Sequence, residues 1–124
     1  MKYILTLMLI TAHVPAFAFD DNEDCDAGSG STYSQACFAS KEANKADKQL
    51  NAKYQQILRI YKKAKADKEI KLLVEAQRAW IRYRDKVCDF ENQAFGGINS
   101  ISWVRCKARI TTARLSELNE FGSE

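Results

Sequence analysis

The sequence predicts an all-α fold, a small antiparallel three-helix bundle stapled by two disulfides. Apolar residues recur every three or four positions in three successive stretches, which is the spacing of one helix face. Strand signals are nearly absent, and Pro15, the only proline among the 124 residues, precedes all three stretches. The four cysteines can supply the covalent staples that a domain this small often needs.

The first 18 residues have the pattern of a secretory signal peptide. Lys2 is followed by an almost unbroken apolar run to Ala12, and Ala16-Phe17-Ala18 forms the small-x-small pattern of a cleavage site. The run is too short for a membrane-spanning helix. We therefore expect residues 1–18 to be removed, and the mature chain to be periplasmic or secreted without stable membrane insertion.

Residues 19–33 form an acidic leader that becomes rich in glycine and serine. Its acids are Asp20, Asp21, Glu23, Asp24 and Asp26. Because Lys2 leaves with the signal segment, the mature chain keeps 18 basic and 16 acidic residues, a net charge of +2. Without the five leader acids the rest carries +7. An acidic leader therefore precedes a basic helical domain, residues 34–122.

The first helix is expected from about Ser34. Its face consists of Ala43, Asp47, Leu50, Tyr54, Ile57, Leu58 and Tyr61. A polar, lysine-rich stretch from Lys62 to Glu69 then predicts a turn or a break before the next helix.

The second helix is expected from Ile70 and ends before Asn92. Its face consists of Ile70, Leu73, Gln77, Trp80, Ile81, Arg84, Val87 and Cys88. The strongest helix breaker of the chain, Gly96-Gly97, follows it. The third helix is expected to begin at a cap, Ser100 or Ser102, and to stop by Gly122. Its face consists of Val104, Ala108, Thr111, Leu115 and Leu118.

Four cysteines allow three disulfide pairings. We favour Cys25–Cys37, which ties the leader to the first helix, and Cys88–Cys106, which bridges the second and third helices. Each closes a short loop and stabilises the fold by about 3 kcal/mol in the chain-entropy description. The second bridge would also fix the shape of the loop that it encloses.

Histidine is absent from the mature chain, since His13 lies in the segment to be removed. Catalytic groups of the Ser-His-Asp or Cys-His type therefore cannot form. His-ligated zinc, copper or haem is excluded for the same reason. The cysteines show no CxxC spacing and are expected in disulfides. We predict no catalytic residue, no metal site, no cofactor and no enzymatic activity.

Four polar residues lie on or beside helix faces where a bundle normally has leucine. These residues are Asp47, Gln77, Arg84 and Arg114. They either line a substrate pocket or form a buried network in which Asp47 and Tyr54 meet one of the arginines. Because no general base lies nearby, we favour the structural network.

Two further features are expected to be structural. Trp80 is interpreted as a core residue rather than a ligand platform. The basic run from Lys62 to Lys71 could attract an anionic polymer or a membrane surface, but it also contains acids and is typical of a solvated turn. Nucleic-acid binding is not expected, because no groove-reading element or interleaved aromatic residues accompany the basic side chains.

Residues 92–100 place two large apolar side chains around a glycine pair, inside the second disulfide. The candidate partner-binding residues are Phe95, Gly96, Gly97, Ile98, Asn99 and Ser100. Exposed apolar side chains on a constrained loop can anchor in the cleft of a partner at small entropic cost. The alternative, an ordinary helix connection with Phe95 folded onto the core, stays open.

Residues 76–85 (AQRAWIRYRD), followed by Cys88, resemble the LprI-like lysozyme-inhibitor family of bacterial envelope proteins. The similarity extends over about residues 25–120 through Ala43-Asn44, Asp47, Leu50-Asn51, Tyr54, the glycine pair, Cys106, Thr111, Arg114 and Leu118. It implies a small helical protein of the periplasm or the exterior that binds and occludes a peptidoglycan hydrolase of the lysozyme type.

Two alternatives remain. An immunity protein would neutralise a peptidoglycan-degrading toxin, such as an amidase, from a rival cell. An envelope structural or polyanion-binding module would use the run from Lys62 to Lys71 and bind cell-wall polymer in a salt-sensitive way. The inhibitor and the immunity protein both predict a tight protein complex without turnover.

Overall fold

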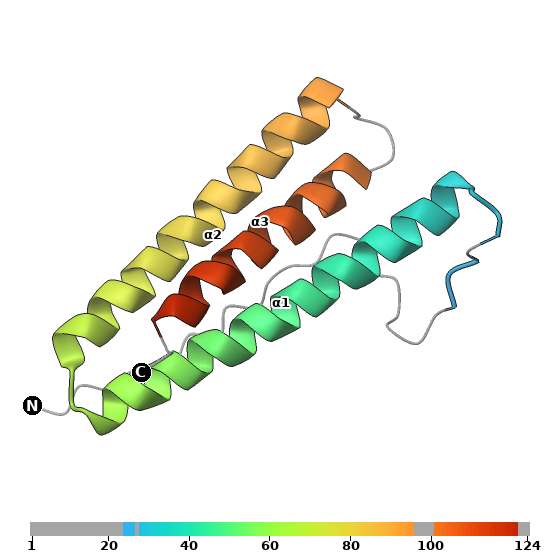
Figure 1. Cartoon of the computed structure of the whole chain (residues 1–124). Coiled ribbons are helices and arrows are strands. Elements are labelled where there is room, and N and C mark those ends of the chain that lie inside the picture. Colours follow the sequence, from blue (N-terminus) through green and yellow to red (C-terminus); the bar gives the residue numbers. More distant parts are fainter. Residues whose placement is uncertain (1–23, 27, 96–100, 122–124) are drawn as a thin grey trace, which may run out of the picture.

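The computed structural model confirms the all-α prediction (Figure 1). It describes residues 24–26, 28–95 and 101–121, which contain three helices: α1 (Thr32–Lys63), α2 (Asp67–Phe95) and α3 (Ile101–Glu120). Those ranges contain no strand. Successive helices run antiparallel, and α3 lies between α1 and α2 and packs against both. The predicted signal segment, residues 1–18, and residues 19–23 and 27 of the leader lie outside the described residues.

The helix α1 begins two residues earlier than expected because Ser31 caps it. The side-chain oxygen of Ser31 accepts a hydrogen bond from the Ser34 backbone N–H at 3.1 Å, which satisfies one of the unpaired donors of the first turn. The Ser34 hydroxyl donates to the backbone carbonyl of Asp26. These contacts hold the end of the leader against the start of α1.

The turn between α1 and α2 is shorter than the lysine-rich stretch suggested. Backbone N–H groups of Ala64 and Ala66 donate to carbonyls of the last turn of α1, and Lys65 adopts a left-handed conformation with φ of 55°. The helix α2 then begins at Asp67 rather than Ile70. Asp67 and Glu69 lie in its first turn, where negative charge is favourable at a helix N-terminus.

The core consists of two clusters along the bundle. Leu50, Ile57 and Leu118 form the first, and Cys88, Cys106 and Ile110 form the second. Trp80 packs against both clusters, so it acts as the core residue that its place on the apolar face predicts. Of the helices described, none has a segment long and apolar enough to cross a membrane.

Two disulfides staple the bundle, with the pairings favoured from the sequence. The sulfur atoms of Cys25 and Cys37 are 1.94 Å apart, and those of Cys88 and Cys106 are 2.10 Å apart. The first bond joins the end of the leader to α1. The second joins α2 to α3 inside the second core cluster, where both of its cysteines are buried.

Candidate functional site

The predicted partner-binding segment begins on a helix rather than a loop. The helix α2 continues through Asn92 and ends only at Phe95, so the expected end before Asn92 is wrong. The residues after Cys88 contain no helix breaker before Gly96, and the bond from Arg109 Nη2 to Glu91 Oε1 (2.5 Å) ties this last stretch to α3. Residues 96–100, and with them Gly96, Gly97, Ile98, Asn99 and Ser100, lie outside the described residues.

Phe95 is exposed at the end of α2. With 78% of its surface accessible, it does not fold onto the core. Because it extends from a helix that is bonded to α3, its backbone is already ordered. The backbone of such a residue loses little further freedom when a partner buries the side chain. The side-chain oxygen Oδ1 of Asn92, one turn before, is buried and has no hydrogen-bond partner among the described residues.

Trp103 lies in the first turn of α3 and was missed in the sequence interpretation. Its indole N–H donates to Asp89 Oδ1 of α2 at 3.1 Å. The ammonium group of Lys107, one turn further along α3, lies 4.5 Å from the ring centroid, a cation–π contact. The four-residue spacing of Trp103 and Lys107 was the available signal, since residues so spaced meet on one helix face. These contacts fix a partly buried aromatic ring near the end of the bundle.

The environment of Lys107 disfavours the charged form of its ammonium group. Its pKa is lowered below the usual lysine value, first by burial and then by the positive charge of Arg84, while Asp47 and Asp85 act in the opposite direction. A lysine whose charged form is disfavoured gains from any additional negative charge nearby.

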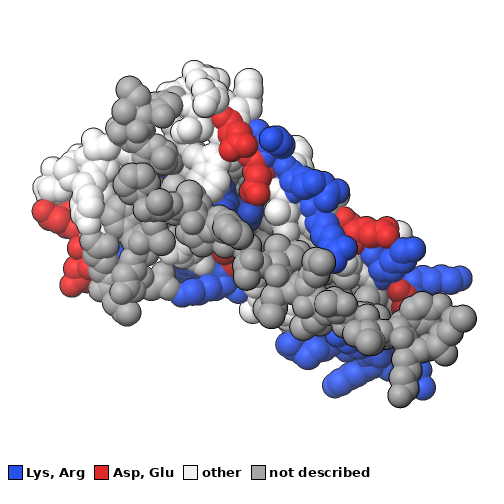
Figure 2. All heavy atoms as spheres, turned by 180° about the vertical axis from the view of Figure 1, so that it is seen from behind, with Lys and Arg blue, Asp and Glu red and all other residues white. Residues whose placement is uncertain are grey.

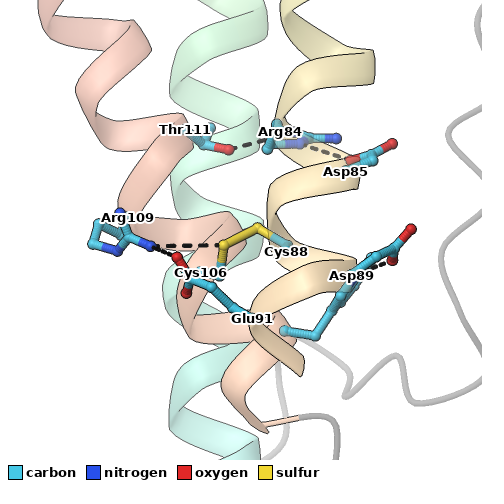
Figure 3. The surroundings of a disulfide bond; sticks show 9 residues. Arg84, Asp85, Cys88, Asp89, Glu91, Cys106, Arg109 and Thr111 are labelled. Atoms are coloured by element: carbon cyan, nitrogen blue, oxygen red, sulfur yellow. Dashed lines mark hydrogen bonds and ion pairs between the residues drawn. A yellow bond between two sulfur atoms is a disulfide. The ribbon is translucent and has the colours of Figure 1, made fainter. Parts of the chain in front are cut away.

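The disulfide between Cys88 and Cys106 joins α2 to α3 near this end of the bundle (Figure 3). Arg109 Nη2 lies 3.8 Å from the Cys106 sulfur and also bonds Glu91. The bridge and the ion pair thus connect the last part of α2 with the first half of α3. The described part of the site is therefore held by contacts between α2 and α3.

The predicted polar network is present as two separate clusters. In the first, Arg84 donates from Nη1 to the Thr111 hydroxyl at 3.4 Å and from Nε to Asp85 Oδ1 at 3.0 Å (Figure 3). Its Nη1 also donates to Asp47 Oδ1 at 3.1 Å. The Arg84 side chain is only 8% exposed, and its guanidinium carbon lies 5.0 Å from the Trp80 ring centroid. One arginine therefore links all three helices.

The second cluster lies further along the bundle. Arg114 donates from Nε to Gln77 Oε1 at 3.2 Å and from Nη1 to Glu117 Oε2 at 2.7 Å. Tyr54 packs against the first core cluster instead of bonding either arginine, and burial, partly opposed by Arg78, raises the pKa of its hydroxyl. Each guanidinium therefore donates from two of its three nitrogens to side chains of the protein.

Basic and neutral surfaces separate along the molecule. Figure 2 shows Lys and Arg gathered toward the end where α1 and α2 are joined, while most described atoms at the opposite end are neither basic nor acidic. The run from Lys62 to Lys71 divides between the last turn of α1, the connecting turn and the start of α2. Within the described ranges, no group of three His, Cys, Asp or Glu residues could hold a metal ion.

Replacing Asp47 by alanine is expected to destabilise the protein more than replacing Arg84 by methionine. Asp47→Ala leaves a buried guanidinium without one of its partners, at a cost of about 2 kcal/mol. Arg84→Met keeps the apolar stem and leaves Asp47, which is 38% exposed, accessible to water. We expect that variant to lose about 1 kcal/mol. Urea unfolding followed by far-UV circular dichroism measures both, and the reverse order would contradict the assignment of Arg84 as a structural residue.

Comparison with known families finds a match to the family described as Lysozyme inhibitor LprI, over residues 25–118. These residues include all four cysteines, both arginine clusters and nearly all of the three helices. Neither a curated protein nor a solved structure matches the chain.

Proposed function

The chain belongs to the LprI lysozyme inhibitor family, and on that premise we propose that it binds a lysozyme-type peptidoglycan hydrolase and occludes its cleft, with no catalysis of its own. We place this action in the periplasm or outside the cell, after removal of residues 1–18. The partner is a protein, and no cofactor takes part.

The exposure of Phe95 is the observation that supports a binding surface at this end of the bundle. An aromatic side chain that is 78% exposed on an ordered helix end has the properties of an interface anchor. Trp103 lies on the neighbouring helix, and its ring is fixed by Asp89 and Lys107. Aromatic residues dominate the binding energy of protein interfaces when they fill a pocket on the partner. Phe95 would insert into the cleft, and Trp103 would lie against its rim.

The net charge of the chain indicates that binding to a basic hydrolase would depend on shape complementarity rather than on long-range electrostatic attraction. Apart from the five leader acids, the mature chain carries a net charge of +7, so it would not attract a basic hydrolase from a distance. Affinity would then depend on burial of the aromatic anchors.

Removing the Phe95 side chain is expected to weaken inhibition by about 30-fold, the loss typical of an interface hot spot. The assay is clearing of peptidoglycan by several lysozymes, with the oxidised mature protein titrated as parent and as Phe95→Ala. Phe121→Ala is the matched control, because Phe121 is also exposed but follows the other end of α3. It should inhibit like the parent.

Different outcomes of this assay test the binding site and the proposed function. Equal inhibition by the parent and Phe95→Ala would show that the hydrolase contacts another surface. No inhibition of any lysozyme by the parent would contradict the lysozyme-type function, and the immunity role against an amidase toxin would be tested next by capture of that toxin. Salt-sensitive binding to purified cell-wall polymer, lost on neutralising Lys62 to Lys71, would instead support the polyanion-binding module.

A further inference from the structure

A second exposed apolar surface runs along α2, away from the core. Leu72, Tyr83 and Phe90 are 65%, 60% and 67% exposed, and the exposed alanines Ala76 and Ala79 lie between them. Together with Lys86, these residues form the α2 stripe: positions 72, 76, 79, 83, 86 and 90. Their alternating spacing of four and three is that of the a and d positions of a coiled coil. A helix stripe of this kind normally faces another helix.

We propose that the α2 stripe is the contact between two copies of this chain, related by a twofold axis with their α2 helices antiparallel. In the arrangement that we favour, Ala76 of one copy lies opposite Ala79 of the other next to the axis. Leu72 then lies opposite Tyr83 of the second copy, on both sides. Small residues at the centre let the two helix backbones approach closely, and the larger side chains close the contact further out.

Charge complementarity fixes this register. With Ala76 opposite Ala79, Glu75 lies beside Arg82 of the second copy, and Glu69 lies opposite Lys86. The twofold axis repeats both, so four ion pairs flank the alanines. Among the residues that the structure describes, none of these four side chains has an ion-pair partner within its own chain.

The neighbouring register is disfavoured by the same charges. Sliding one helix by a heptad places Leu72 opposite Phe90, which would bury more apolar surface. It also brings Arg82 beside Arg82 of the second copy and Glu75 beside Asp89. Like charges at these flanking positions discriminate against a pairing. The charges are thus complementary in the proposed antiparallel register and repulsive in the neighbouring one, and the twofold axis repeats each pair.

The dimer would carry its two Phe95 ends at opposite poles. In the proposed register, Phe95 is between 17 and 18 residues from the axis, or about 26 Å along the helix. The two phenylalanines are then about 50 Å apart, which leaves room for one hydrolase at each end. This consequence rests on the proposed function, whereas the dimer itself does not.

Sedimentation equilibrium of the oxidised mature protein tests the contact. We expect a dimer that dissociates on dilution between about 100 and 1 μM, within the range of specific protein contacts. Tyr83→Glu should give a monomer with unchanged far-UV circular dichroism. The control Ile60→Glu also places an acid at an exposed apolar position, but on α1, and should remain a dimer. A parent that is monomeric at 100 μM overturns the proposal, as does a dimer that Tyr83→Glu leaves intact.

A charge swap tests the register. Glu75→Arg and Arg82→Glu should each raise the dimer dissociation constant about tenfold, because each turns two attractive pairs into repulsive ones. The double variant restores both pairs and should dissociate like the parent. Failure of the double variant to recover would overturn the register. A monomeric parent whose inhibition is abolished by Tyr83→Glu would assign the stripe to the hydrolase instead of a second copy.

Discussion

Replacing Cys88 and Cys106 together by alanine is expected to lower the free energy of unfolding by about 3–5 kcal/mol. Closing an 18-residue separation removes chain entropy from the unfolded state, which alone accounts for about 3 kcal/mol. Both cysteines are also buried beside Ile110 in the second core cluster, so their sulfur atoms contribute packing that alanine does not replace. A small domain is stabilised by only about 5–15 kcal/mol in total. The variant would therefore be far less stable than the parent.

The matched control is removal of the other disulfide, through Cys25→Ala and Cys37→Ala. Its separation of 12 residues gives nearly the same chain entropy, but only Cys37 of this pair is buried, and Cys25 is partly exposed. We expect a loss of about 2–3 kcal/mol, since only the start of α1 loses its brace. Urea denaturation of both variants, compared through their midpoints and slopes, gives the two values. Equal losses would contradict a larger packing contribution from the Cys88–Cys106 bridge, in which both cysteines are buried.

The helices could be predicted from the sequence because their periodicity repeats over many residues. The positions of the helix ends depend on single contacts, and they were predicted less accurately. The helix α1 starts at Thr32 because the Ser31 side chain caps it, and α2 continues to Phe95 because nothing breaks it before the glycines. Ser102, one of the two expected caps of α3, is its second residue and so lies inside the helix.

The sequence predicts that the buried arginines have polar partners, but it does not predict which residues these partners are. A buried arginine must find acceptors, and the sequence offered Asp47 and Tyr54 for two arginines. Which of them meet depends on how far each helix lies along its neighbour, and that offset has no local signal in the sequence. The structure brings Asp47 to Arg84 and Gln77 to Arg114, and leaves Tyr54 in the apolar core.

The surfaces were the least predictable part. Trp103 and Tyr83 have the same aromatic character as core residues, and only the packing of α3 between the other helices decides which side of each helix stays accessible. The exposure of Phe95 likewise depends on where α2 ends, since Phe95 is the last residue of that helix. Periodicity identifies a helix face, but two faces of α2 are apolar. The positions of α1 and α3 determine which of these two faces is buried.

Ile57→Ala is expected to destabilise the protein by about 3–4 kcal/mol, whereas Ile60→Ala on the same helix should change stability by less than about 1 kcal/mol. Ile57 is 1% exposed and packs in the first core cluster with Leu50 and Leu118, so its truncation leaves a cavity that a braced bundle cannot close. Ile60, three residues away, is 46% exposed, and alanine's higher helix propensity offsets part of its lost contact. Because the chemical change and the helix are identical, the difference between the two urea midpoints isolates burial. Comparable losses at both positions would mean that α1 presents a different face to α3 from the one described.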